Sequence, residues 1–240
     1  MTVGSGARGT PAGRRGASVD AFKAILAKDL RVELRTLQSV PAMALFGITT
    51  FVLFRYGLDR TTLSGSLAAG VLLATVLFAA ILAINRLFVA ERDEGGFDAI
   101  RLAPVDGTAL GGAKAAALLV YLLVLEAITL PVFAIFFLDS WSGLPALAGV
   151  LALADVGLAA IGALVSVIAA NSRARDLLVP LILLPLLVPV MIAAGNAAQP
   201  LLAAQGPDYG GIGKWLGFLA LYDMTFIAVA FAVYDFLLED

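Results

Sequence analysis

The sequence predicts an all-α, polytopic membrane protein with six transmembrane helices. Of its 240 residues, 61% are hydrophobic and 14% are charged, whereas soluble domains are roughly 45–50% apolar and about 25% charged. The mean hydropathy is +0.97. Apolar runs such as 71–84, 115–125 and 177–194 contain few ionisable residues, and a membrane-spanning helix needs about 20 mostly apolar residues. A water-soluble core of this length could not hide so much apolar surface.

Two segments are expected before the membrane domain. Residues 1–17 are rich in Gly, Ala and Arg, which predicts a disordered basic tail. Ser18 is a predicted N-cap, and residues 18–38 predict an amphipathic helix in the membrane interface, with Asp29 and Glu33 on its polar surface. The alternative is a soluble helix packed on a partner. The apolar positions, spaced by three and four, are Val19, Phe22, Leu26, Leu30, Leu34 and Leu37.

The membrane domain is expected to occupy residues 39–240. Pro41 can begin the first span, because its missing N–H would have no intrahelical partner there. The second, fourth and sixth spans are long enough to tilt or to project from the bilayer. The predicted spans are Pro41–Leu58, Leu63–Val89, Ala113–Leu138, Leu144–Ala170, Leu177–Ala197 and Ile212–Leu238.

The distribution of Lys and Arg predicts how the spans are oriented. Thirteen of these residues precede the first span or lie in or beside the second-to-third and fourth-to-fifth connections. The opposite side has three, Arg55, Arg60 and Lys214. Because cytoplasmic connections are enriched in Lys and Arg, both termini are expected in the cytoplasm, with the chain in the plasma or inner membrane.

The longest predicted cytoplasmic connection, residues 90–107, is a candidate docking element. It contains a charged extension of the second span, a Gly-Gly break, a short amphipathic stretch and Pro104 as a stop. Phe97 and Ile100 would be apolar anchors within a charged rim, which suits a soluble partner. The alternative is an ordinary charged loop. The candidate docking residues are Glu91, Asp93, Glu94, Gly95, Gly96, Phe97, Ile100, Arg101 and Leu102.

Three carboxyl side chains, Glu126, Asp155 and Asp223, fall well inside predicted spans, and a fourth, Asp235, lies near the cytoplasmic end of the last span. A charge at mid-membrane costs about 2.5–3.5 kcal/mol on insertion scales, so each is expected to face protein or water. They predict either a polar translocation path or proton relay, or interhelical hydrogen bonds to a Thr or Tyr. The fifth span is expected to kink and is a further candidate for a moving pathway; its prolines are Pro180, Pro185 and Pro189.

Several kinds of chemistry are excluded. The sequence has no Cys or His, so it offers no thiol, no Cys/His zinc site and no histidine base or haem ligand. Residues 107–114 approach the phosphate-binding P-loop pattern, but Ala113 stands where Lys is required. We therefore expect a non-catalytic chain that binds no metal, cofactor or nucleic acid of its own.

Several segments resemble the haem exporter protein B (CcmB) family, the permease-like component of the ABC complex of cytochrome c maturation. The resemblance covers residues 18–240, and its most specific part is the proline-rich stretch 175–192. Departures are the basic extension of residues 1–17 and Ala103, where the family has Ser. The other matching segments are 22–35, 86–88, 96–104, 215–217 and 222–223, with the acidic end Glu239-Asp240.

The resemblance implies a six-helix permease of the ABC-2 type that works as two copies with two copies of a separate cytoplasmic ATPase. Other cytochrome c maturation membrane subunits usually accompany it. The residues from Glu91 to Leu102 then correspond to the coupling helix seated in a groove of the ATPase. ATP is used by that partner and haem is a possible substrate. The implied role is haem delivery or release of a haem chaperone.

Three other functions stay open on the sequence alone. The chain could be an ABC-2 permease for a lipid, a polysaccharide or a drug, which the neighbouring genes would reveal. It could instead be a proton-coupled secondary carrier that uses Glu126, Asp155 and Asp223, in which case transport would need no ATPase. A passive scaffold for a haem chaperone would keep its function with an inactive ATPase.

Overall fold

The computed structural model describes residues 11–58, 62–93, 107–169 and 175–237, and every regular element in these ranges is an α-helix. All of the helices except the first are long and apolar enough to cross a membrane, which makes six candidate spans. The predicted fold class is confirmed. The helices are α1 (Pro11–Thr36), α2 (Ser39–Gly57), α3 (Gly65–Asp93), α5 (Gly107–Phe137), α6 (Leu144–Ala169), α7 (Arg175–Leu201) and α8 (Ile212–Leu237).

The observed ends of the spanning helices depart from the predicted ones most in α5, and α3 and α7 each end four residues beyond the predicted span. Helix α5 begins at Gly107 rather than Ala113, and α7 continues past Ala197 to Leu201. Glycines at the start of α5 weaken an isolated helix, but here they let neighbours approach. A Cβ at Gly111 would overlap the Tyr234 ring of α8. Tertiary packing therefore sets this helix end.

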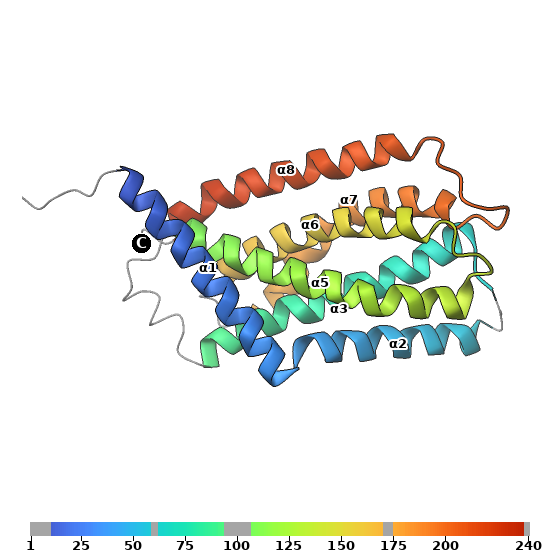
Figure 1. Cartoon of the computed structure of the whole chain (residues 1–240), viewed down its shortest axis with the longest axis horizontal. Coiled ribbons are helices and arrows are strands. Elements are labelled where there is room, and N and C mark those ends of the chain that lie inside the picture. Colours follow the sequence, from blue (N-terminus) through green and yellow to red (C-terminus); the bar gives the residue numbers. More distant parts are fainter. Residues whose placement is uncertain (1–10, 59–61, 94–106, 170–174, 238–240) are drawn as a thin grey trace, which may run out of the picture.

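Helix α6 is the centre of the bundle. It packs against α5, α7 and α8 and more weakly against α3, while α2 packs on α3 and α5 (Figure 1). In the apolar window of α6, 72% of the residues are buried, against 22% in α2 and 17% in α8. The side chains that α2, α7 and α8 expose are large and apolar, among them Leu45, Leu181 and Leu221. Such a surface suits contact with lipid rather than water.

Helix α1 crosses one end of the bundle obliquely and meets α2 at a corner (Figure 1). This end, where α3 ends and α5 begins, is called the α1 end below; the other is the opposite end. Helix α1 begins at Pro11, so the expectations of a tail over all of 1–17 and of Ser18 as N-cap are corrected. Proline is well tolerated in the first turn, and Ala12 and Arg14 favour helix.

The side of α1 that faces the bundle also differs from the prediction. Phe22 and Leu26 are half-buried as predicted, but Asp29 and Glu33 are buried too, on the same side. Val19, Leu34 and Leu37, predicted to share the apolar face, are exposed. Residues 22, 26, 29 and 33 lie on one helical face by spacing, so the helix turns two carboxylates inward.

Candidate functional site

The predicted docking segment lies almost entirely outside the described residues. Glu91 and Asp93 belong to the last turns of α3, and their side chains are not described. The other candidate docking residues, Glu94, Gly95, Gly96, Phe97, Ile100, Arg101 and Leu102, also lie outside the described ranges. Their role stays a prediction.

Two of the three membrane carboxyls lie together. Glu126 of α5 and Asp155 of α6 lie close enough for their carboxyl groups to interact electrostatically, and they are 6% and 0% exposed. Neither Asp155 oxygen nor Glu126 Oε1 has a hydrogen-bond partner among the described residues. Two adjacent negative charges repel strongly in an apolar interior, so this arrangement favours a proton on one of the two carboxyls.

The expected Thr and Tyr partners are used elsewhere. The Thr129 hydroxyl, three residues beyond Glu126, donates to the Leu125 carbonyl at 2.9 Å. The Tyr222 hydroxyl donates to the Leu186 carbonyl of α7 at 2.8 Å. The Thr129 and Tyr222 hydroxyls therefore donate to backbone carbonyls rather than to these carboxyls.

Asp223 of α8 occupies a separate place. Its Oδ1 lies against Gly157 of α6, where a Cβ would overlap it, and Val190 of α7 borders the same position. Asp223 is 3% exposed, and neither of its oxygens has a hydrogen-bond partner among the described residues. Gly157 makes room for this carboxyl where α6, α7 and α8 meet.

These positions limit what the carboxyls can do together. The described residues contain no group of three or more Asp, Glu, His or Cys placed to hold a metal ion. The predicted relay of three carboxyls is thus a contacting pair between α5 and α6 plus a single group on α8. What the pair can do chemically is hold and exchange a proton.

The prolines of α7 do not form an internal path. Pro185 is exposed and Pro180 and Pro189 are half-buried, while Leu183 and Leu187 face the core. Helix α7 is one continuous element with Pro200 also inside it. Each proline removes the N–H donor to the carbonyl four residues earlier. The predicted kink stays a prediction.

A polar joint at the α1 end was missed by sequence reasoning. Lys114 Nζ of α5 lies 2.8 Å from Asp29 Oδ2, and these side chains are 3% and 6% exposed. The Tyr121 hydroxyl donates to the Asp29 carbonyl oxygen at 3.1 Å. A Cβ at Gly112 would lie 3.6 Å from the Phe22 ring, so α1 packs directly on α5. Two sequence features could have predicted this joint. Lys114 stands at the start of an apolar run, and Asp29 and Glu33 lie on the same helical face as Phe22 and Leu26.

The corner between α1 and α2 belongs to the same joint. Glu33 Oε1 accepts the backbone N–H groups of Ser39 and Val40, both at 2.8 Å, and so caps α2. Leu37 turns the corner with φ +47°. Arg86 of α3 donates to the Gln38 carbonyl oxygen. Helix α5 therefore holds α1, and α3 holds the corner that follows it; these are the two helices on either side of residues 94–106.

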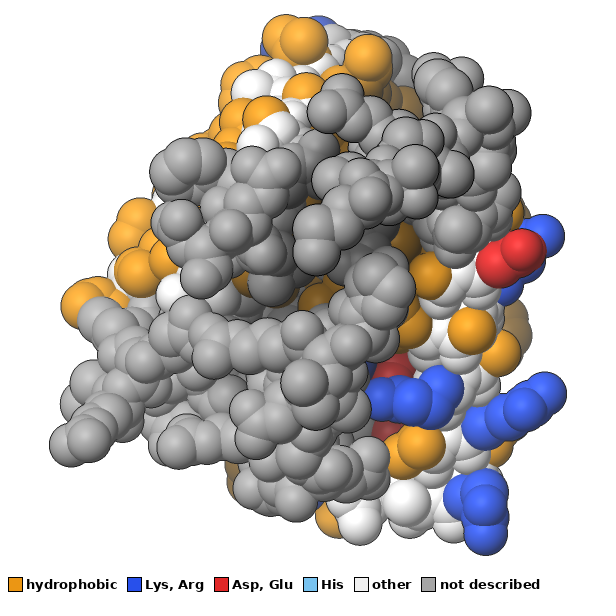
Figure 2. Space-filling view, turned by 90° about the vertical axis from the view of Figure 1, so that its left-hand side faces the viewer, with side chains coloured by type: hydrophobic (Ala, Val, Ile, Leu, Met, Phe, Trp, Pro, Cys, Tyr) orange, Lys and Arg blue, Asp and Glu red, His pale blue; other side chains and the backbone are white. Residues whose placement is uncertain are grey.

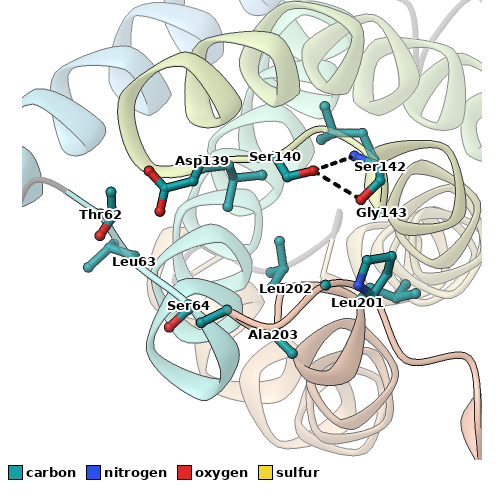
Figure 3. A pocket seen from close by; sticks show the side chains of 15 residues that line it. Thr62, Leu63, Ser64, Asp139, Ser140, Ser142, Gly143, Leu201, Leu202 and Ala203 are labelled. Atoms are coloured by element: carbon teal, nitrogen blue, oxygen red, sulfur yellow. Dashed lines mark hydrogen bonds between the residues drawn. The ribbon is translucent and has the colours of Figure 1, made fainter.

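At the opposite end, backbone hydrogen bonds join the segments that connect the helices. The Leu63 N–H donates to the Phe137 carbonyl at 3.0 Å, and the Gly65 N–H to the Leu202 carbonyl at 2.7 Å. Between them is a cavity of about 90 Å³ (Figure 3). Small-molecule sites usually measure about 300–1,000 Å³, so this space suits a few waters. Its polar lining comes from Thr62, Ser64, Asp139, Ser140 and Ser142.

Comparison with known proteins gives two matches. A family model described as CcmB protein matches residues 20–235. Heme exporter protein B of Paracoccus denitrificans (strain Pd 1222) is 31% identical over 214 residues, which cover 87% of this chain and 94% of that protein. The family match extends from α1 to the end of the last span.

Proposed function

Because the chain belongs to the CcmB protein family, we propose that it is the membrane subunit of an ABC complex for haem export in cytochrome c biogenesis. The single observation that carries this proposal is the family match, which includes all six candidate spans. The subunit is not itself an enzyme: a separate ATPase hydrolyses ATP, as the near-miss P-loop with Ala113 in place of Lys suggests. The role includes either haem delivery or release of a haem chaperone.

The α1 end faces the cytoplasm in this proposal. The excess of Lys and Arg on this side supports the assignment. Residues 91–102 then meet the ATPase as a coupling helix. Movement of this segment would reach α3 and α5 first; Lys114 of α5 holds α1, and Arg86 of α3 holds the corner between α1 and α2. Two copies of the chain and further cytochrome c maturation membrane subunits complete the assembly.

One observation favours a second candidate. Glu126 and Asp155 lie close together inside the bundle, and three of their oxygens have no hydrogen-bond partner among the described residues. That arrangement would suit a proton-coupled carrier, which needs titratable groups inside the membrane. Such a carrier would work without an ATPase.

The test is co-purification of the chain with its cognate ATPase, followed by charge reversal of three acids. The variant Glu91→Lys/Asp93→Lys/Glu94→Lys is expected to lose either association or stimulated ATP turnover. Asp208→Lys, exposed at the opposite end, is the matched control and should retain both. Unchanged coupling in the triple variant would remove the assignment of this segment.

Two further measurements separate the alternatives. An inactive ATPase should abolish haem export or chaperone release, whereas a carrier or a scaffold would continue. A reporter fused at residue 98 should report a cytoplasmic position. An external position would reverse the proposed orientation.

A further inference from the structure

The charged side chains of α1 are divided unevenly between its inner and outer surfaces. Residues 18–36 contain four basic and three acidic residues, so the sequence is nearly balanced. In the structure Asp29 and Glu33 face inward, where they bind Lys114 and cap α2. Lys23, Arg31 and Arg35 are exposed, and Lys28 is exposed beside them. The outer surface of α1 therefore keeps four cations and one acid, Asp20.

Figure 2 looks onto the end of the molecule where α1 lies. Lys and Arg side chains project along the right-hand edge of this view, beside apolar ones; one acidic side chain also projects there, and other acidic atoms lie set back among the basic ones. The arrangement agrees with the burial of Asp29 and Glu33.

Large apolar side chains lie beside these cations. Val19, Leu34 and Leu37 are 51%, 74% and 60% exposed. Leu34 and Leu37 immediately precede Ser39, where the first span begins. They therefore lie where the hydrocarbon region starts. Arg31 and Arg35 lie within about two turns of these leucines along α1. Lys23 lies about one turn from Val19, so these basic residues are placed at headgroup depth.

We propose that the outer surface of α1, formed by Lys23, Arg31 and Arg35 with Val19 and Leu34, is a binding site for anionic phospholipid headgroups. Guanidinium groups bind phosphate through two parallel hydrogen bonds. The exposed apolar side chains enter the acyl boundary and hold the helix at the depth of the phosphates. An acidic soluble protein would bind the cations but would leave Leu34 in water, so the surface fits lipid better.

The test uses the purified full-length chain in mild detergent, with native mass spectrometry to titrate bound lipid. Phosphatidylglycerol and phosphatidylcholine with identical acyl chains are the probes. The unmodified chain is expected to prefer phosphatidylglycerol. Lys23→Gln/Arg31→Gln/Arg35→Gln should lower that preference by about tenfold or more, since each basic residue contributes about a fewfold near an anionic surface.

Two other variants separate charge from the remaining effects. Lys214→Gln removes an exposed cation at the opposite end and should leave the preference unchanged. Val19→Ser/Leu34→Ser should weaken the binding of both lipids similarly and preserve the ratio of their affinities. If the triple variant does not fold, Arg31→Gln and Arg35→Gln are measured singly, each with an expected loss of about threefold.

Three results would overturn the proposal. The first is an unmodified chain that binds the two lipids equally. The second is a triple variant, or both single variants, with the unmodified preference. The third is a triple variant that keeps its lipid preference but loses the ATPase, which would identify the surface as a protein interface.

Discussion

The joint at the α1 end and the middle of the bundle both bury acidic side chains, and the surroundings of these side chains differ. At the joint, Asp29 contacts a lysine and Glu33 accepts two backbone N–H groups. In the middle, Asp155 lies close to Glu126, and neither Asp155 nor Asp223 has a hydrogen-bond partner among the described residues. A buried charge is tolerated when it is paired. The joint is thus a fixed structural element, and the middle is the place where protonation can vary.

The largest effect is expected from breaking the joint. Lys114→Met leaves the Asp29 carboxylate buried without its cation, which should lower the free energy of unfolding by about 3–5 kcal/mol. Unfolding in mixed micelles measures this loss. Lys28→Met is the matched control, because Lys28 is exposed and 3.5 Å from Asp29, and it should cost less than about 1 kcal/mol.

A double variant sharpens this test. Asp29→Leu/Lys114→Met removes both charges and should regain most of the stability lost in Lys114→Met. Equal losses in Lys114→Met and Lys28→Met would contradict the pairing described for the joint.

A smaller effect is expected at Asp223. Gly157→Ala places a methyl group against the present position of Asp223 Oδ1, and should lower the free energy of unfolding by about 1–3 kcal/mol. The double variant Gly157→Ala/Asp223→Ala should regain the stability lost in Gly157→Ala. Gly149→Ala on the same helix has nothing within 4 Å of its Cβ, so it should be neutral or stabilising by about 1 kcal/mol. A loss unaffected by Asp223→Ala would show that the backbone is the obstacle.

The smallest effect on stability is expected at the carboxyl pair. Glu126→Gln and Asp155→Asn keep the size of each side chain and its capacity for hydrogen bonding, so each should change the free energy of unfolding by less than about 1 kcal/mol. Export activity measured on the same variants separates the two roles. Lost activity with retained stability would assign the pair to the transport cycle, whereas retained activity would make it a packing element.

The helices could be predicted because their signal is local. Apolar runs of sufficient length identify spans without knowledge of their neighbours, and the spacing of Phe22 and Leu26 identifies α1. Asp29 and Glu33 were assigned outward because charged residues usually face solvent. Their inward position depends on Lys114, which lies far along the chain.

The contacts of the site depend on packing between helices and had no local signal. Glu126 and Asp155 lie on different helices, and their meeting depends on how α5 crosses α6. Asp223 was expected to share their path, but Gly157 places it on another side of α6. The side chains of the predicted coupling residues lie outside the described part of the chain, so their role stays a prediction.

The backbone hydrogen bonds at the opposite end affect the order in which a newly made chain can complete its structure. Gly65 donates to the carbonyl of Leu202, a residue near the end of the fifth span. A ribosome delivers Leu202 long after Gly65 has emerged, so the first turn of α3 lacks its acceptor until five spans have been synthesised. Insertion can proceed helix by helix, but this end of the bundle closes late.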